Sequence, residues 1–348
     1  MPVSWSESSK YWPGRWPVSE RILITGGAGF IGFHLAKRLI AEGFGVCLVD
    51  NHTRGIHDES LEALLSQPRA SIVEADMLDR DAVLALGTDY LAIFHLAAII
   101  GVRHVLKRPY DVLLHNTRML ENVLTLAKHQ RRLSRLLFAS TSEVYAGTLK
   151  HFQLSVPTPE NTALALTNIS EPRTSYMLSK IMGESMVHQS RLPFTIFRPH
   201  NVYGPRMGMA HVVPEQLNKA FHANDGDSLQ VFSPDHRRAF CYIDDAVEML
   251  RRMLINEACR GATLNLGTQS PEVSIRDLVR VCIDTCGKQL NIEELHSTPG
   301  SPARRAPDMQ KTNQLIGFES EIGLRQGIQE TWAWYREHVF TRDGATAR

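Results

Sequence analysis

The sequence lacks long apolar runs, an excess of charge of one sign and paired cysteines. No apolar stretch approaches the roughly 20 residues that a membrane-spanning helix requires, so we expect no contact with a membrane. Because 38 Lys and Arg residues nearly balance 37 Asp and Glu residues, bulk charge offers no attraction for nucleic acid. Residues 1–20 lack the charged-then-apolar order of a signal peptide, so we expect an N-terminal extension on a cytoplasmic protein.

The cysteines and histidines show no spacing typical of a metal site. Of the five cysteines, only Cys282 and Cys286 are close enough to share one face of a helix, and no second pair is near them. The fifteen histidines are scattered as well. We therefore expect reduced thiols and no metal, in a chain whose 348 residues can form one large domain or two modest ones.

What the sequence does contain is a glycine-rich segment, TGGAGFIG, between an apolar strand and an amphipathic helix. Gly26 permits a tight turn out of the strand, Gly29 lets backbone N–H groups approach a pyrophosphate, and Gly32 lets the helix pack against the strand. The helix N-terminus then directs partial positive charge at the phosphates. The segment predicts a dinucleotide site, and an ordinary glycine turn is the alternative.

Two aspartates follow later strands of the same pattern. Asp50 ends the second predicted strand, where a carboxylate accepts hydrogen bonds from the adenosine ribose and repels a 2′-phosphate. This favours NAD over NADP, although Arg54 is nearby. Asp76 follows the third strand and is placed to accept a hydrogen bond from the adenine amine. The alternatives are a loop cap for Asp50 and a turn-forming role for Asp76.

Strands and helices alternate through the first 200 residues. Strands are predicted at residues 22–25, 46–49, 70–74, 90–96, 136–140 and 195–198. The longest helix between them is predicted at 109–129. This order is typical of an α/β fold with a doubly wound parallel sheet, whose strand C-termini share one ligand-binding edge.

The pattern changes beyond about residue 200, where the loops lengthen. Helices are predicted at 213–223, 244–256, 275–286 and 324–339, with strands at 229–232 and 263–266. We expect a smaller α/β substrate-binding domain over 201–340. Segments near 240–270 are expected to return to the nucleotide-binding domain over 21–200.

Tyr176 and Lys180 are four residues apart in a helix predicted to begin near Thr174, so they share one face. A lysine ammonium beside a phenol favours the phenolate, and we expect the pKa of Tyr176 to fall toward neutrality. Such a tyrosine can accept a proton from a sugar hydroxyl while hydride leaves the same carbon. Tyrosine and lysine also occur at this spacing on ordinary helices. The pair indicates a catalytic site only because a glycine-rich nucleotide-binding segment precedes it in the chain.

Five motifs occur in a fixed order: TGGAGFIG, HLAA, STSEVY, YMLSK and RPHNVYGP. Together they resemble the extended short-chain dehydrogenase/reductase family, and within it the NAD-dependent nucleotide-sugar epimerases, dehydratases and decarboxylases. The resemblance covers residues 20–340. It implies a Rossmann-type fold and a tightly held NAD that oxidises a sugar, usually at C4, to a keto intermediate. It also implies a homodimer formed through the helices near 110–129 and 174–190.

The resemblance assigns roles to individual residues. Tyr176 resembles the catalytic base, Lys180 its partner that also holds the nicotinamide ribose, and Thr141 the hydroxyl that bonds the substrate. Glu143 resembles a further acid/base group. The implied NAD contacts are Gly26, Gly29, Phe30, Ile31, Gly32, Asp50, Asn51, Asp76, Met77, Leu96, Ala97, Ala98, Asn116, Tyr176 and Lys180.

The resemblance also implies a site for the substrate diphosphate. Asn201 and Arg238 resemble its binding residues, and Arg305 resembles a second arginine, for which a surface salt bridge is the alternative. An arginine fork suits phosphate oxygens because it can donate two parallel hydrogen bonds.

The reaction itself stays open between three members of the family. Dehydratases carry Asp-Glu after the threonine, where this chain has Ser142 and Glu143. Decarboxylases share the Thr-Ser-Glu, GPRM and RRAPD segments, but they usually have an arginine where this chain has Ile181. Residues 176–184 resemble epimerases. We therefore expect a nucleotide-sugar epimerase acting at C4 of a UDP-sugar. UDP-glucuronate decarboxylase and dehydratase are the alternatives, and a non-catalytic NAD-sensing protein is the alternative of another class.

Overall fold

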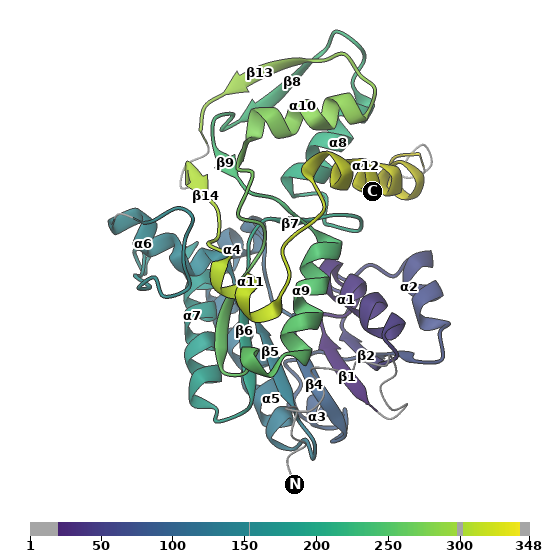
Figure 1. The fold of residues 1–348 in the computed structure, drawn as a ribbon, viewed down its shortest axis with the longest axis vertical. Helices are drawn as coiled ribbons and strands as arrows, with labels where there is room; N and C mark the ends of the chain where they lie inside the picture. The colour runs from purple at the N-terminus through teal and green to yellow at the C-terminus, as the bar shows by residue number, and fades with distance from the viewer. Residues whose placement is uncertain (1–19, 153, 298–301, 342–348) are drawn as a thin grey trace. The chain divides into compact units, whose positions relative to one another are not determined.

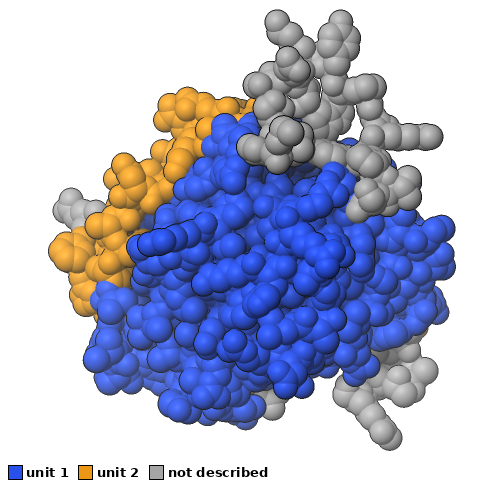
Figure 2. All heavy atoms as spheres, turned by 90° about the horizontal axis from the view of Figure 1, so that it is seen from below, with its two compact units in different colours: residues 1–146, 166–198, 247–264 blue, residues 147–165, 199–246, 265–348 orange. Residues whose placement is uncertain are grey.

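The computed structural model describes residues 20–152, 154–297 and 302–341 (Figure 1). Nearly all of the extension expected at residues 1–20 lies outside the described residues. The chain divides into two compact units (Figure 2). Unit 1 comprises Met1–Ala146, Leu166–Arg198 and Val247–Leu264, and unit 2 comprises Gly147–Ala165, Pro199–Ala246 and Asn265–Arg348. The domain boundaries expected from the sequence stay predictions.

Unit 1 contains a seven-stranded sheet with the order β11-β6-β5-β4-β1-β2-β3. Every pairing from β6 across to β3 is parallel. Ile22, Leu23 and Ile24 of β1 are fully buried, as expected for a parallel strand covered on both faces. The strands are β1 (Arg21–Thr25), β2 (Gly45–Asp50), β3 (Ala70–Glu74), β4 (Tyr90–His95), β5 (Arg135–Ala139), β6 (Phe194–Pro199) and β11 (Ala262–Leu266).

Helices connect these strands in the predicted alternation. Asp58 and Asp79 cap the helices that follow them by accepting backbone N–H bonds, and Pro109 begins α5, where a missing N–H costs nothing. Leu120 and Val123 of α5 join the core cluster that also contains Ile93 of β4. The helices are α1 (Phe30–Ala41), α2 (Glu59–Leu65), α3 (Arg80–Leu84), α4 (Val102–Lys107), α5 (Pro109–Lys128), α7 (Thr174–Gln189) and α9 (Ile243–Ile255).

The strand order reverses between β1 and β4. Chain connections run outward from this point in both directions, so the loops that follow β1 and β4 diverge and leave a ligand-binding position between them. The doubly wound α/β fold predicted from the sequence is confirmed.

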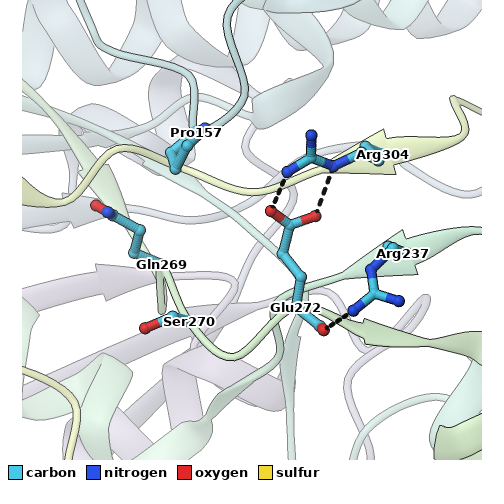
Figure 3. A pocket seen from close by; sticks show the side chains of 6 residues that line it. All are labelled: Pro157, Arg237, Gln269, Ser270, Glu272 and Arg304. Atoms are coloured by element: carbon cyan, nitrogen blue, oxygen red, sulfur yellow. Dashed lines mark hydrogen bonds and ion pairs between the residues drawn. The ribbon is translucent and has the colours of Figure 1, made fainter.

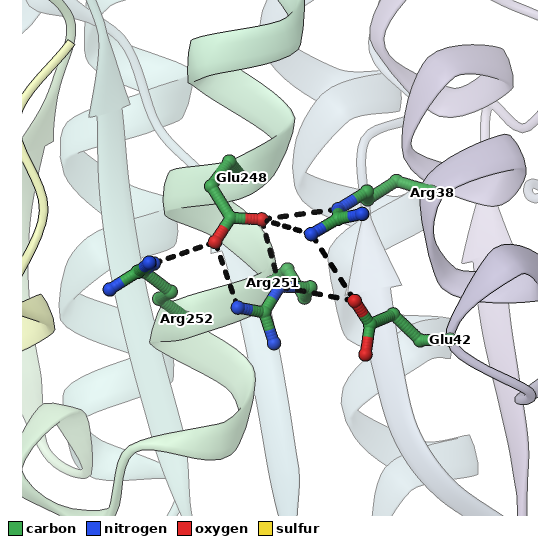
Figure 4. A network of polar contacts seen from close by, with 5 residues as sticks. All are labelled: Arg38, Glu42, Glu248, Arg251 and Arg252. Carbon is green, nitrogen blue, oxygen red and sulfur yellow. Dashed lines mark hydrogen bonds and ion pairs between the residues drawn. The ribbon is translucent and has the colours of Figure 1, made fainter. Parts of the chain in front are cut away.

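An ion network joins α1 to α9 within unit 1 (Figure 4). The Glu248 carboxylate accepts from Arg38 at 2.8 Å, from Arg251 at 2.8 Å and from Arg252 at 2.6 Å. Arg38 also lies 3.2 Å from Glu42, the residue that directly follows α1. These hydrogen bonds lower the pKa of Glu248 to about 2, although its burial acts in the opposite direction. The network therefore fixes the carboxylate in its charged form between the two helices.

Unit 2 contains three small sheets: β10-β7, β12-β9-β14 and β13-β8. Leu229 and Val231 of β8 pack with Val279 and Ile283 of α10 in one apolar cluster. The strands are β7 (Val202–Tyr203), β8 (Ser228–Phe232), β9 (Arg237–Arg238), β10 (Cys241–Tyr242), β12 (Val273–Ser274), β13 (Asn291–Leu295) and β14 (Arg304–Arg305). The helices are α6 (Ala146–His151), α8 (Val212–His222), α10 (Ile275–Thr285), α11 (Gln310–Ile316) and α12 (Leu324–Tyr335).

Several short elements were not predicted from the sequence, among them α4, α6, α11, β13 and the two-residue strands. Two residues are too few to show the alternation of apolar and polar residues that identifies a strand. Such strands are recognised only by their pairing with a neighbouring strand. The last predicted helix ends as an α-helix at Tyr335 and continues as one π-helical turn, Arg336–Phe340. Within the described ranges, no helix combines the length and the apolarity needed to cross a bilayer.

Candidate active site

Two glycines of the glycine-rich loop leave no room for a side chain, and a third leaves little. Gly26 has a φ of +70°, and a Cβ there would lie 2.9 Å from the backbone nitrogen of Ala97 after β4. A Cβ on Gly32 would lie 2.4 Å from the carbonyl oxygen of Gly26, and one on Gly29 would lie 3.1 Å from the same atom. The structure thus brings the three glycines together after β1. Phe30 and Ile31 are the first two residues of α1, which begins directly after Gly29.

Asp50 lies at the end of β2 and is 8% exposed. Its two carboxylate oxygens accept backbone N–H bonds from Ala28 at 3.0 Å and from His52 at 2.9 Å. The carboxylate is therefore held beside the glycine-rich loop, in the position where a dinucleotide fold binds a ribose. Asn51 next to it is exposed, and its Oδ1 accepts from the Thr53 N–H at 3.1 Å.

Three other predicted cofactor residues are engaged within the protein. Asp76 accepts the Leu78 N–H at 2.9 Å, which is the turn-forming role weighed as its alternative. Met77 is 4% exposed and packs in the apolar core of unit 1. Asn116 accepts from the Ile99 N–H at 2.7 Å and donates to Ser179 Oγ at 3.2 Å.

The segment after β4 is held against β1. The Leu96 and Ala97 N–H groups donate to the Thr25 carbonyl at 3.1 Å and the Thr25 hydroxyl at 3.3 Å. Leu96, Ala97 and Ala98 are half-buried. Together with the glycines and Asp50, they surround the point where the strand order reverses.

The structure brings Thr141, Tyr176 and Lys180 together at the end of β5. Thr141 precedes the 3₁₀ turn Ser142–Tyr145, its hydroxyl accepts the Glu143 N–H at 3.2 Å, and the same hydroxyl is near enough to the Tyr176 phenol to lower its pKa. Tyr176 is 8% exposed and Lys180 is 4% exposed. The Lys180 Nζ donates to the Ala139 carbonyl at 2.7 Å and lies 6.0 Å from the centre of the Tyr176 ring.

The structure contradicts the low pKa expected for Tyr176. Burial raises the pKa of Tyr176, the Glu143 carboxylate raises it further, and the Thr141 hydrogen bond and the Arg54 charge lower it. Burial lowers the pKa of Lys180 to about 8, and Glu184 opposes that shift. The helical spacing correctly predicted that Tyr176 and Lys180 share one face of α7. It predicted the wrong direction for the pKa shift of Tyr176, because spacing contains no information about how deeply the two residues are buried.

A buried polar network, not found from the sequence, lies behind these residues. It consists of Ser140, Tyr145, Glu184 and Arg198, each at most 6% exposed. Glu184 is one helical turn beyond Lys180, so the repeat of four from Tyr176 was the signal that could have revealed it. Arg54 was likewise noticed only as a neighbour of Asp50. Its guanidinium donates to the Ile100 carbonyl at 3.2 Å and acts electrostatically on Tyr176.

The three predicted substrate residues lie together in unit 2. Arg305 donates to Asn201 Oδ1 at 2.8 Å, and Asn201 donates to the Ala239 carbonyl at 2.9 Å. Arg238 is 7% exposed and is directly opposite Arg305 in the parallel β9–β14 pair. Burial and then the charge of Arg305 lower the pKa of Arg238 to about 10. The Arg238 guanidinium donates to the backbone carbonyls of Arg237 at 2.7 Å and Pro302 at 2.6 Å, so two positive charges are held close together here.

The fold and the unit 1 site define the class of dinucleotide-binding α/β proteins, with a buried tyrosine–lysine pair at the end of β5. The cradle that any Cβ would fill, together with the fixed Asp50 carboxylate, fits NAD. Among the described residues, no group of three or more His, Cys, Asp and Glu side chains could hold a metal ion.

The model of the NAD dependent epimerase/dehydratase family matches residues 22–267, and the chain belongs to that family. It is an NAD-dependent enzyme.

Similar proteins include enzymes with two different activities. The chain is 31% identical over 335 residues to a UDP-N-acetyl-alpha-D-glucosaminuronate decarboxylase of Bacillus cytotoxicus, covering 92% of this chain and 99% of that one. It is 31% identical over 339 residues to UDP-glucuronic acid decarboxylase 2 of Arabidopsis thaliana, covering 94% and 71%. Its structure resembles that of UDP-glucuronic acid 4-epimerase from Bacillus cereus in complex with UDP-glucuronic acid and NAD. That match has a TM-score of 0.78 at 25% identity and covers 91% and 99% of the two chains.

Proposed function

We propose that the protein is an NAD-dependent decarboxylase of a UDP-hexuronate, of which UDP-glucuronate is the simplest. The observation that carries this proposal is the 31% identity to two decarboxylases, each of which matches more than nine-tenths of the chain. The Thr141-Ser142-Glu143 segment supports it. The epimerase favoured on sequence alone becomes the alternative, supported by the similarity to a UDP-glucuronic acid 4-epimerase.

In the proposed reaction, Tyr176 accepts the proton of the C4 hydroxyl while the C4 hydride departs. Thr141 holds the same sugar oxygen, since its hydroxyl can both donate and accept as the ketone forms. The NAD, when bound, supplies the hydride acceptor and a positive ring charge that opposes the effect of burial on the phenol. Lys180 would hold the ribose of the cofactor.

Carbon dioxide can leave once C4 is a ketone, because the carboxylate at C5 is then β to a carbonyl. The C5–carboxylate bond breaks and its electron pair moves into an enolate whose oxygen is on C4. A proton is then added at C5, hydride returns to C4, and Tyr176 returns its proton to the C4 oxygen. We propose that Glu143, which is exposed two residues past Thr141, delivers the C5 proton. Ser142 is 7% exposed and is a poor acid, which disfavours dehydration.

We also propose the substrate and partner contacts that the sequence suggested. Asn201, Arg238 and Arg305 would bind the diphosphate, since they form one hydrogen-bonded and cationic group. The proposed homodimer would form through α5 and α7, where Tyr110 is 72% exposed and Met182 is 40% exposed. A cytoplasmic location stays a prediction.

The proposal is tested by incubating the protein with UDP-glucuronate and, separately, with UDP-N-acetylglucosaminuronate. The products are followed by NMR and by detection of carbon dioxide. Carbon dioxide and a UDP-pentose are expected from the first. A product epimeric at C4 that retains its carboxylate would establish the epimerase instead. Tyr176→Phe should retain NAD binding and lose roughly 100-fold or more in turnover. Equal turnover in this variant would overturn the proposed mechanism, and no turnover by either protein would favour the NAD-sensing alternative.

A further inference from the structure

The three-stranded sheet β12-β9-β14 of unit 2 has arginines on both of its faces. Arg237 and Arg238 form β9, Arg304 and Arg305 form β14, and the register places 237 opposite 304 and 238 opposite 305. Because neighbouring residues of a strand point to opposite faces, the four arginines form two pairs. The 238/305 pair is the proposed diphosphate site. The 237/304 pair has no part in the proposed function.

Charge on the 237/304 face is only partly balanced (Figure 3). Arg304 forms a bidentate pair with the Glu272 carboxylate, at 3.0 Å from Nε and 2.6 Å from Nη2. Arg237 reaches the same residue at 2.7 Å, but it donates to the backbone carbonyl and not to the carboxylate. Two guanidinium charges therefore face one carboxylate. Like charges directly opposite in a sheet are unfavourable, and the 238/305 pair on the other face adds to the cost.

The 237/304 pair borders a cavity of ≈ 530 Å³. Pro157, Gln269, Ser270 and Glu272 complete its lining. Figure 3 shows the Gln269 and Ser270 side chains across the cavity from the two arginines. The volume is within the range of small-molecule sites, and the lining combines amide, hydroxyl and guanidinium groups. Glu272 orients Arg304, so less freedom is lost when a ligand binds.

We propose that this cavity binds the phosphate group of a small phosphorylated metabolite, at a site separate from the substrate site. Arg237 supplies the uncompensated charge, and Arg304 is the second donor, held in place by Glu272. Guanidinium groups suit phosphate because their N–H groups match its oxygens in pairs.

Occupancy of this cavity should weaken diphosphate binding by the 238/305 pair. The two pairs share both strands, so an anion on one face reduces the positive potential on the other. Reciprocity requires that the substrate diphosphate weaken binding of the metabolite by the same factor. The cavity is thereby a site for inhibition by a phosphorylated compound.

Titration calorimetry of the full-length protein with pyrophosphate, in the presence of saturating UDP, tests the proposal. One pyrophosphate per chain is expected to bind, and Arg237→Gln should weaken it roughly tenfold. Arg280→Gln is a matched control because Arg280 is an exposed arginine of the same unit, paired with Asp277 at 3.4 Å, and it should have no effect.

Equal affinity in the wild type and in Arg237→Gln, or no saturable binding at millimolar pyrophosphate, would overturn the proposal. At saturating substrate, the kcat of Arg237→Gln should equal that of the wild type, whereas its KM should rise, because the lost charge lowers the positive potential at the 238/305 pair. An unchanged kcat separates this site from the substrate site. If UDP itself fails to bind, the proposed function is at fault. The same comparison of variants without UDP then tests the cavity alone.

Discussion

Glu184 and Arg198 form a bidentate ion pair in the interior of unit 1. Arg198 Nε lies 2.8 Å from one carboxylate oxygen and Nη2 lies 2.6 Å from the other. A third donor, Nη1, reaches the Tyr145 hydroxyl at 2.7 Å, and the Ser140 hydroxyl also donates to Glu184. Because Ser140 directly precedes Thr141 and Glu184 shares α7 with Tyr176, this pair fixes the two proposed reacting groups relative to each other.

Glu184→Gln should therefore destabilise the protein by about 3–5 kcal/mol, because it leaves the Arg198 guanidinium buried without a countercharge. Tyr145→Phe removes only one hydrogen bond to the same arginine and should cost about 1.5–3 kcal/mol. Urea unfolding of both variants measures the difference. A Glu184→Gln variant within about 1 kcal/mol of the wild type would show that the pair does not stabilise the fold.

Lys180 should make stability rise with pH in alkaline solution. Its pKa is about 8 in the folded protein and 10.5 as the ordinary value, so between these values the unfolded chain binds a proton that the folded chain does not. By linkage, the free energy of unfolding then increases with pH across this window, by roughly 3 kcal/mol at most. His95 nearby stays neutral there because its pKa is lowered to about 3.

Lys180→Met tests this dependence, since methionine keeps the bulk and loses the charge. The variant should exceed the wild type most in stability below pH 8, and the gap should close as pH rises toward 10.5. Loss of the hydrogen bond to Ala139 adds an offset that does not change with pH. Urea unfolding at several pH values gives the slope, and parallel curves for the two proteins would contradict the prediction.

Glu143→Gln should shift the pH profile of turnover toward acid. The Glu143 carboxylate raises the pKa of Tyr176, so its removal makes the phenolate easier to form and moves the acid limb of kcat/KM to lower pH. Turnover itself should also fall, because Glu143 is the proposed proton donor. The kcat/KM of the variant, measured from its residual activity at several pH values, gives the position of the acid limb. Glu121→Gln, an exposed position on α5, is the control, and an unshifted limb in Glu143→Gln would refute the electrostatic coupling.

Glu248→Gln should destabilise the protein at neutral pH by about 1–3 kcal/mol, since the carboxylate accepts from three arginines. The pKa of Glu248 is lowered to about 2 in the folded state, below its ordinary 4.5. Its contribution is therefore present above pH 4.5 and is lost as pH falls toward 2. The difference between variant and wild type should shrink over that range in urea unfolding, and a constant difference would argue against the ion network.

Local sequence signals predicted unit 1 in detail. The helix expected at 109–129 is found at Pro109–Lys128, and the strand expected at 70–74 is found at Ala70–Glu74. The helix is long and its apolar residues follow a single period, and the short strand is bounded by polar residues, so local signals identify both. Unit 2 was less predictable, because β9 and β14 are two arginines each and pair across 67 positions of the chain.

For this protein, the sequence alone determined the dinucleotide loop, the carboxylate after β2 and the tyrosine–lysine pair, because each depends on residue type at short spacing. The tertiary structure alone decided the direction of the pKa shift at Tyr176 and the pairing of Glu184 with Arg198. It also decided that the arginines of β9 and β14 lie opposite one another in one sheet. Those properties depend on burial and on contacts between distant segments. Desolvation and long-range pairing leave no trace in local spacing.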